Sequence, residues 1–268
     1  MTFLPSWYQV CILYLSLYLC RCDLDIIKMI IEYDGTHFYG WQRQTKSRSI
    51  QGVIERVLSK ILKKDIEIDG AGRTDAGVHA YGQVATFGCD LPMPLESLKR
   101  AMNNFLPSDV RIVDLDFADA DFHARYSAIG KTYVYKIKNS KERDVFLANY
   151  SYHYPYDLDD DLIRRAMEKL IGKHDFSSFM ASGSSAQNPV RTIHAIDLKR
   201  SGNMLEFTFT GDGFLYKMVR LLAAYLLEVG QSRIPLDKTE ELLENPTRAY
   251  TSKVAPAAGL YLKEVYYN

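Results

Sequence analysis

Apolar side chains recur at helical spacing over residues 50–62, the clearest pattern in the chain. They stand three or four residues apart and so form one stripe on an α-helix: Ile50, Val53, Ile54, Val57, Leu58, Ile61 and Leu62. A second helix is predicted over residues 94–105, with a proline near its first turn. Its buried stripe is expected to contain Leu95, Leu98, Met102 and Phe105.

Shorter apolar runs and period-two alternation predict strands around these helices. In the first half of the chain the predicted strands are 26–33, 66–70, 83–89 and 110–116. Together with the two helices, they give the element order β-α-β-β-α-β.

The second half of the chain shows a similar order with insertions. Strands are predicted over residues 131–138, 192–200, 204–210 and 260–266. The tripeptide Ser201-Gly202-Asn203 is a hairpin signal between the middle two. Helices are predicted over residues 158–171, 215–229 and 236–244.

These elements predict an α+β fold of two domains, residues 25–125 and 126–268. Each is expected to be a β-α-β-β-α-β unit of the RRM or ferredoxin-like kind. The two units are expected to join edge to edge in one continuous, mainly antiparallel sheet, with a central cleft between them.

Residues 1–24 stand outside this plan. The first 20 residues contain no charge, and residues 7–19 are strongly apolar. A signal peptide would need a basic start and a small-residue cleavage site. A membrane anchor needs about 20 apolar residues, whereas Pro5, Ser6 and Gln9 interrupt this run. We expect a non-native extension ahead of the domain, and no membrane association.

Composition indicates an ordinary soluble globular protein, with 47% hydrophobic and 25% charged residues and a formal net charge of zero. Basic residues nevertheless recur near predicted loops, so the neutral total can hide a basic face suited to RNA. The four cysteines form no CxxC pair and no zinc-type set with histidines. Neither a disulfide framework nor a metal is expected, and a reducing cytoplasm fits this usage.

A glycine-rich loop, residues 70–80, separates two predicted strands. Its glycines permit sharp turns, and Arg73 and Asp75 are the charged groups it presents. Taken alone, an Asx-type turn with a solvated arginine also explains it. An earlier loop, residues 39–44, interleaves aromatic, amide and arginine side chains as RNA-binding loops do. Its Trp41 also fits a residue that covers the edge of a core.

Several stretches in order resemble the TruA family of tRNA pseudouridine synthases. The matching stretches are Glu32-Tyr33-Asp34-Gly35, Gly40-Trp41-Gln42-Arg43-Gln44, Ala71-Gly72-Arg73-Thr74-Asp75-Ala76-Gly77-Val78-His79, Phe122-His123-Ala124-Arg125-Tyr126-Ser127-Ala128, Tyr133-Val134-Tyr135, Asp175-Phe176-Ser177-Ser178-Phe179, Phe214-Leu215-Tyr216-Lys217-Met218-Val219-Arg220 and Ala258-Gly259-Leu260-Tyr261-Leu262. The ordered set covers the chain from about Ile26 onward and favours a catalytic role for Asp75.

This resemblance implies isomerisation of uridine to pseudouridine at positions 38 to 40 of the tRNA anticodon arm, without a metal or organic cofactor. Asp75 matches the catalytic aspartate, which acts as a nucleophile or stabilises charge while a glycal-type intermediate forms. Tyr133 matches the tyrosine that stacks on the target base. Arg220 matches the basic residue that pairs with the aspartate, and Arg73 a residue that helps to flip the nucleotide out.

Further site residues follow from the same resemblance. Leu262 is expected in the apolar wall of the pocket, and Arg43, Arg125 and Lys217 are expected to contact phosphates. The resemblance also implies a homodimer. The alternative is a catalytically inactive tRNA-binding module on the same scaffold, although the joint presence of Asp75, Tyr133 and Arg220 favours the enzyme. A membrane-tethered protein would rest on residues 1–20 alone.

Overall fold

The computed structural model describes residues 24–184 and 186–268. The predicted extension, residues 1–24, therefore lies outside the described residues except for Leu24. Within the described ranges no helix has the length and apolar character needed to cross a membrane.

The N-terminal part of the structure has the predicted alternation of strands and helices. Its elements are β1 (Asp25–Tyr33), the short 3-10 helix η1 (Gly35–His37), α2 (Ile50–Leu62), β2 (Asp69–Gly70), β3 (His79–Cys89), α3 (Leu95–Phe105) and β4 (Val110–Ala118). The C-terminal elements are β5 (Gly130–Lys138), β6 (Tyr152–His153), α4 (Asp160–Leu170), β7 (Gly172–Asp175), η2 (Ser177–Phe179), β8 (Val190–Ser201), β9 (Met204–Gly211), α5 (Met218–Gly230), α6 (Lys238–Glu244), η3 (Ala257–Gly259) and β10 (Leu260–Tyr266).

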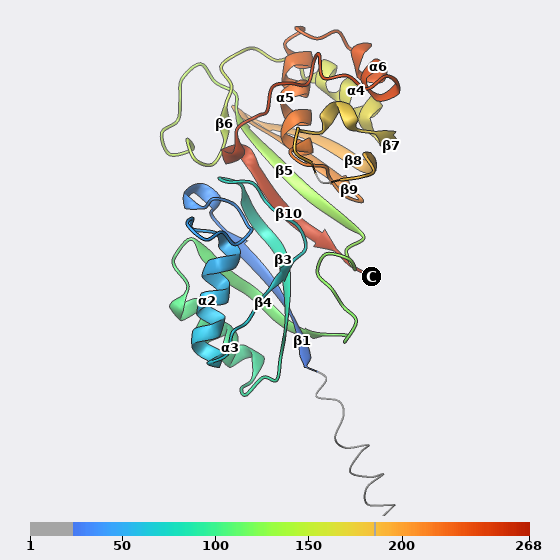
Figure 1. Cartoon of the computed structure of the whole chain (residues 1–268). Helices are drawn as coiled ribbons and strands as arrows, with labels where there is room; N and C mark the ends of the chain where they lie inside the picture. Colours follow the sequence, from blue (N-terminus) through green and yellow to red (C-terminus); the bar gives the residue numbers. More distant parts are fainter. Residues whose placement is uncertain (1–23, 185) are drawn as a thin grey trace, which may run out of the picture.

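The strands form one large, mostly antiparallel sheet that runs through the described molecule (Figure 1). Its path is β4-β1-β3-β10-β5-β9-β8-β7, with β2 paired to β3 and β6 paired to β5. Figure 1 shows α2 and α3 over one end of this sheet and α4, α5 and α6 gathered at the other end. The prediction of a continuous, mainly antiparallel sheet is confirmed.

The last strand, β10, joins the two parts of the sheet. It pairs in parallel with β3 through Tyr261 opposite His79 and Leu262 opposite Ala80. On its other side it pairs antiparallel with β5, where Leu262 lies opposite Tyr133. The end of the chain therefore positions the middle of the chain against the glycine loop that precedes β3.

The two clearest helices illustrate how burial follows sequence pattern. In α2 the predicted stripe is buried except at Val53 and Ile61, which are partly buried, and Lys63 ends the helix in a left-handed conformation (φ 53°). Helix α5 is apolar on nearly every side and lies within the core of the C-terminal part, as such helices do. It begins at Met218 rather than at the predicted residue 215, because Lys217 adopts a left-handed conformation with φ 58°.

Three expectations about single elements are wrong in detail. Phe105 is 54% exposed, and the Lys60 ammonium lies 4.3 Å from its ring centre. Strand β3 begins at His79, four residues before the predicted start, because these residues find partners on β10 and β1. The predicted strand over residues 66–70 pairs only at Asp69–Gly70, and the polar strand β7 was not predicted at all.

Candidate active site

A cavity of about 510 Å³ opens between the N-terminal and C-terminal parts of the sheet. Its walls come from the glycine loop before β3, the connection between β4 and β5, strand β5 itself and the start of α5. Five of the predicted site residues line it: Arg73, Asp75, Arg125, Tyr133 and Lys217. The central cleft expected from the sequence is this cavity.

The glycine loop is held in place by hydrogen bonds along its length. The Ala71 amide donates to the Val84 carbonyl at 2.7 Å, and the Thr74 carbonyl accepts from the Trp41 amide at 3.0 Å. The Tyr33 and Thr74 hydroxyls are hydrogen-bonded at 2.8 Å. Such a loop presents its side chains from a fixed backbone, which is what a preorganised site requires.

Trp41 is part of this support and is not an exposed RNA contact. Its side chain is only 2% exposed. A Cβ added to Gly70 would lie 2.5 Å from the Trp41 ring, so the loop needs a glycine there to pass over the indole. Gly40, at φ +90°, lets the neighbouring segment approach the Thr74 carbonyl equally closely. Within the segment interpreted as an RNA-binding loop, Gly40 and Trp41 therefore support the loop that contains Asp75, while Gln42 lines the cavity.

Asp75 and Arg220 form a direct ion pair in this cavity. The Arg220 Nη1 group donates to Asp75 Oδ2 at 2.7 Å, and the two side chains are 14% and 22% exposed. The same guanidinium donates from Nε to the Ala255 carbonyl at 2.7 Å. Arg220 lies in the first turn of α5, so one side chain links this helix, the segment before β10 and the glycine loop. Charge-assisted bonds of this kind fix the orientation of a carboxylate.

Tyr133 stands beside this pair on β5. It is 9% exposed, and its ring packs edge-on against Phe214 with centroids 5.2 Å apart. Burial raises the pKa of its hydroxyl, and the nearby Tyr33 and Asp75 raise it further. The phenol therefore keeps its proton at neutral pH and is a hydrogen-bond donor there rather than a base.

Basic and aromatic side chains mark the rim of the cavity. Arg73 is exposed, and its Nε donates to the Gln42 side chain at 3.0 Å. Arg125 is exposed next to the Tyr126 ring, at 5.7 Å, and the Lys217 ammonium lies 4.9 Å from the Tyr216 ring. Exposed rings beside cations can stack on bases and contact phosphates.

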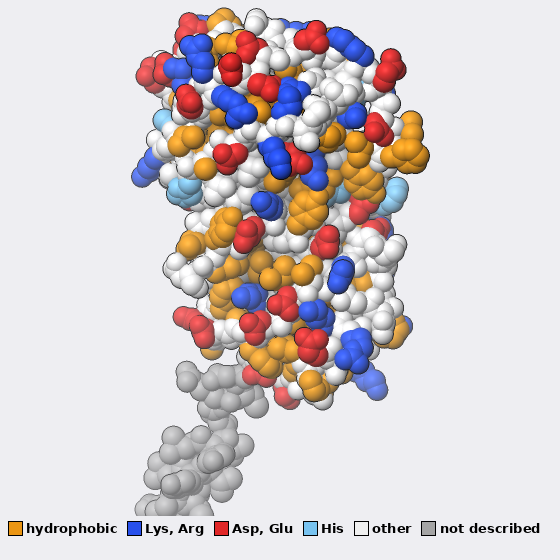
Figure 2. All heavy atoms as spheres, turned by 180° about the vertical axis from the view of Figure 1, so that it is seen from behind, with side chains coloured by type: hydrophobic (Ala, Val, Ile, Leu, Met, Phe, Trp, Pro, Cys, Tyr) orange, Lys and Arg blue, Asp and Glu red, His pale blue; other side chains and the backbone are white. Residues whose placement is uncertain are grey.

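The face opposite the view of Figure 1 has a different character. Figure 2 shows acidic and basic side chains interspersed on that face, with apolar side chains between them and no broad area of one charge. Charges of both signs are therefore distributed over that face, whereas three basic residues lie close together at the cavity rim: Arg73, Arg125 and Lys217.

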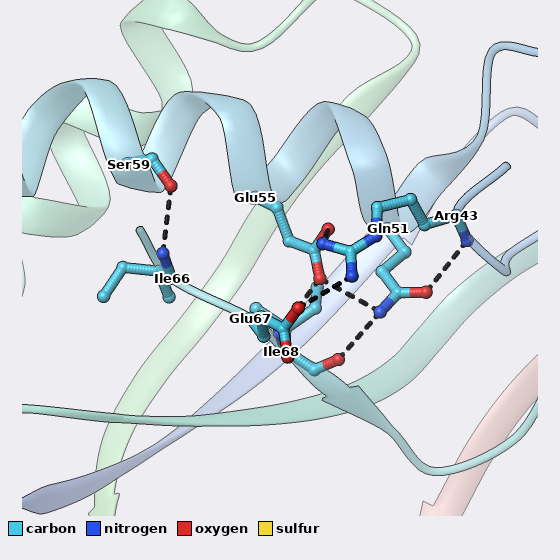
Figure 3. Close-up of polar contacts among 7 residues, drawn as sticks. All are labelled: Arg43, Gln51, Glu55, Ser59, Ile66, Glu67 and Ile68. Carbon is cyan, nitrogen blue, oxygen red and sulfur yellow. Dashed lines mark hydrogen bonds and ion pairs between the residues drawn. The ribbon is translucent and has the colours of Figure 1, made fainter. Parts of the chain in front are cut away.

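Three predicted site residues do not line the cavity: Arg220, which contacts it only through its ion pair with Asp75, Leu262 and Arg43. Leu262 is fully buried opposite Tyr133, and Leu260, two residues earlier on β10, lines the wall instead. Arg43 binds Glu55 at 3.0 Å and Glu67 at 2.8 Å, as Figure 3 shows.

The contacts of Arg43 with Glu55 and Glu67 belong to a hydrogen-bond network that stabilises the fold. Glu55 is 5% exposed and also accepts hydrogen bonds from the Gln51 side chain and the Ile68 amide (Figure 3). Buried carboxylates need such partners. Arg43 thus helps to hold the segment before β2 on α2.

Lys131 also lines the cavity, and no site role was predicted for it from the sequence. Its ammonium donates to the Ala71 carbonyl at 2.8 Å, and burial, with a smaller effect from Arg125, lowers its pKa to about 8. Period-two alternation was the available signal, because Lys131 shares the face of β5 that contains Tyr133. Among the described residues, no cluster of three or more metal-ligating side chains occurs.

The arrangement combines a fixed carboxylate, a protonated phenol and a basic, partly aromatic rim. Comparison with known proteins identifies similar chains. A family model described as tRNA pseudouridine synthase matches residues 29–127 and 166–268. The tRNA pseudouridine synthase A of Geobacillus sp. (strain WCH70) is 47% identical over 243 residues, or 90% of this chain and 98% of that protein.

The protein of the same description from Acetivibrio thermocellus is 44% identical over 241 residues, covering 90% of this chain and 99% of that protein. A chain of the archaeal box H/ACA sRNP Nop10-Cbf5 complex aligns with 92% of this chain and 60% of its own length. Its 10% identity and TM-score of 0.35 place it far from this chain.

Proposed function

The chain belongs to the tRNA pseudouridine synthase family and isomerises uridine in tRNA, and we propose that Asp75 is the carboxylate on which this reaction depends. The ion pair between Asp75 and Arg220, 2.7 Å long and beside Tyr133 in the cavity, is the observation that supports this most directly. The reaction breaks a C–N glycosidic bond, turns the uracil and forms a C–C bond. Asp75 either attacks as a nucleophile or stabilises the developing charge while a glycal-type intermediate forms.

We assign each of the other site residues a separate role in the reaction. Tyr133 stacks on the target uracil, and because burial raises the pKa of its hydroxyl, that hydroxyl keeps its proton and donates a hydrogen bond. Arg220 orients Asp75. Arg73, exposed at the rim, fills the space of the uridine as it is flipped out of the RNA stack. Arg125 and Lys217 contact phosphates, and Leu260 is a better candidate than Leu262 for the apolar wall.

The family resemblance also supports a more specific substrate and assembly. The target is the anticodon arm of tRNA at positions 38 to 40, and the enzyme acts as a homodimer in the cytoplasm. The chain consists of two domains of one plan, residues 25–125 and 126–268. The strand orders β4-β1-β3-β2 and β10-β5-β9-β8 support this repeat. When the strands of each unit are numbered along the chain, with β5, β8, β9 and β10 as the four strands of the second unit, both units have the order fourth, first, third, second.

The test is single-turnover tritium release from [5-³H]uridine-labelled tRNA by the wild type and Asp75→Asn. We expect wild-type release and loss of at least 10³-fold in the variant, because removing a covalent or charge-stabilising group costs that much, while tRNA binding persists. Asp69→Asn is the matched control, since Asp69 lines the same cavity but its side chain is 74% exposed and makes no contact with Arg220.

Two outcomes would contradict the proposal. A wild type that binds tRNA without releasing tritium would favour the inactive binding module. Equal losses in Asp75→Asn and Asp69→Asn would show that the reaction depends on the total negative charge of the cavity, and that Asp75 has no special role.

A further inference from the structure

Lys131 connects the C-terminal part of the sheet to the glycine loop. Its side chain leaves β5 two residues before Tyr133 and reaches the Ala71 carbonyl, to which the ammonium donates at 2.8 Å. A Cβ added to Gly72 would lie 2.8 Å from Lys131 Nζ. The backbone of Gly72 has no unusual φ, and the Lys131 ammonium is the nearest group that a side chain at this position would meet.

The ammonium is half-buried at the cavity wall and lacks an anionic partner. Within residues 24–184 and 186–268 no carboxylate forms a salt bridge with it. The charged and titratable groups around the cavity come from five elements: Asp69 on β2, Arg73 and Asp75 on the glycine loop, His123, Arg125 and Tyr126 on the β4–β5 connection, Tyr133 on β5, and Tyr216 and Lys217 before α5. Of the two carboxylates, Asp75 is bound by Arg220, and Asp69 lies 3.9 Å from His123.

Burying a cation without an anion is costly, and a protein meets that cost by pairing the group or by favouring its neutral form. Burial, with the charge of Arg125, accordingly lowers the pKa of Lys131 to about 8. An ammonium has three donors, and the Ala71 carbonyl uses one of them. The remaining donors and the missing counter-charge define the chemistry of a ligand: an anion with several acceptor oxygens.

We propose that Lys131 is a positioning residue that binds a backbone phosphate of the RNA next to the flipped uridine. The inference rests on the proposed function, because the cavity must first be the site that receives the nucleotide. The same ammonium holds the Ala71 carbonyl, four residues before Asp75. Phosphate binding at Lys131 therefore fixes the substrate strand and the loop that contains Asp75 through one group.

This arrangement couples RNA binding to proton uptake. The free enzyme loses the Lys131 proton as the pH rises through about 8. A bound phosphate favours the charged form, so the complex keeps the proton to higher pH. By linkage, the affinity for tRNA falls as the pH rises above about 8. Arginine at the same position would stay charged throughout this range.

The experiment measures tRNA affinity and the single-turnover rate between pH 7 and 9 for the full-length wild type, Lys131→Arg and Lys131→Met. We expect the wild-type dissociation constant to rise about tenfold over this range, and that of Lys131→Arg to stay flat. Lys131→Met should bind about tenfold more weakly at pH 7, with one fewer phosphate contact in the salt dependence. Lys136→Met is the matched control, because Lys136 lies on the opposite face of the same strand and donates to Tyr81.

The two proposals fail in different ways. If the wild type and Lys131→Met bind tRNA with the same affinity, salt dependence and pH dependence, the Lys131 inference is overturned even though the enzyme is active. If Lys131→Met does not fold, the Lys131→Arg variant decides instead. The inference is then overturned if its tRNA dissociation constant depends on pH as strongly as that of the wild type. An enzyme that shows the expected binding changes but no dependence of turnover on Asp75 contradicts the proposed function alone.

Discussion

At the scale of single residues, the site depends on how closely backbone segments approach one another. Gly70 lies against the Trp41 ring, and Gly72 lies under the Lys131 ammonium. A Cβ at either position would meet its neighbour, but the two neighbours differ in how freely they can move. The Trp41 side chain is 2% exposed and packed on every side, whereas the end of a lysine side chain can move at little cost.

This difference predicts unequal effects of the same substitution. Gly70→Ala should lower the free energy of unfolding by about 2 kcal/mol or more, because overpacking against a fixed ring forces backbone shifts. Gly72→Ala should change it by no more than about 0.5 kcal/mol, since only the Lys131 ammonium has to move. Urea denaturation of both variants measures the contrast. Equal destabilisation would mean that the loop is more rigid at Gly72 than the lysine contact implies.

At the scale of elements, the loop between β5 and β6 is anchored on the N-terminal part of the sheet. The Tyr150 hydroxyl donates to Asp34 at 2.7 Å, and the Tyr261 hydroxyl donates to the Tyr150 carbonyl at 2.8 Å. The His79 ring, 2% exposed, stacks on Tyr261 at 4.6 Å, and its Nε2 is 2.9 Å from the Asn149 carbonyl. His79 Nδ1 lies 3.1 Å from the Gly35 amide nitrogen and 3.2 Å from Asp34 Oδ1, and burial lowers the pKa of the ring, so the ring is neutral at pH 7.

The neutral state of His79 predicts how stability depends on pH. Burial lowers the pKa of His79 below its usual 6.5, although Asp34 acts in the opposite direction. The unfolded chain therefore binds a proton at this residue before the folded chain does, and stability falls as the pH drops below about 6.5. His79→Gln, which keeps a donor for the Asn149 carbonyl, should make the free energy of unfolding less dependent on pH between 7 and 5.5.

The measurement is urea denaturation of both proteins across that range. Five other histidines are present in the chain and remain in both proteins, so the difference between the two curves isolates His79. A His79→Gln curve parallel to that of the wild type would mean that the ring takes up its proton in the folded state as easily as in the unfolded one.

At the scale of the whole molecule, the cavity belongs to neither part of the sheet alone. Asp75 comes from the N-terminal part, while Tyr133 and Arg220 come from the C-terminal part. Strand β10 lies between β3 and β5 and holds these parts together (Figure 1). Its Leu260 and Leu262 are 6% and 0% exposed.

Removal of β10 should therefore abolish activity although every proposed catalytic residue remains. A chain that ends at Gly259 loses a central strand and its buried side chains, a loss comparable with the whole stability of a typical domain. We expect it to lack a cooperative thermal transition by near-ultraviolet circular dichroism and to release no tritium from labelled tRNA. A chain that lacks only the exposed Asn268 is the control. An active chain ending at Gly259 would show that β10 is dispensable for assembly of the cavity.

Local sequence patterns were enough to predict most helices and strands and the residue types of the site. The helix over residues 50–62 and the strand over residues 260–266 have the predicted bounds, because apolar periodicity is a property of neighbouring residues. The family motifs likewise singled out Asp75, Tyr133 and Arg220, which the structure brings to one place. Periodicity also failed locally: Phe105 fits the apolar stripe of α3 yet meets solvent, since its helix ends at the edge of the core.

Which of these residues lie in contact depends on how the whole chain packs. Arg220 reaches Asp75 across 145 residues of sequence, and β10 pairs with strands that are far from it in the chain. The same packing joins Arg43 to Glu55 instead of the cavity, places Leu260 rather than Leu262 on the wall, and buries the Lys131 ammonium beside the loop of Asp75. A residue pattern states which face of an element is buried, whereas the partner on that face depends on strand register and on how the elements pack.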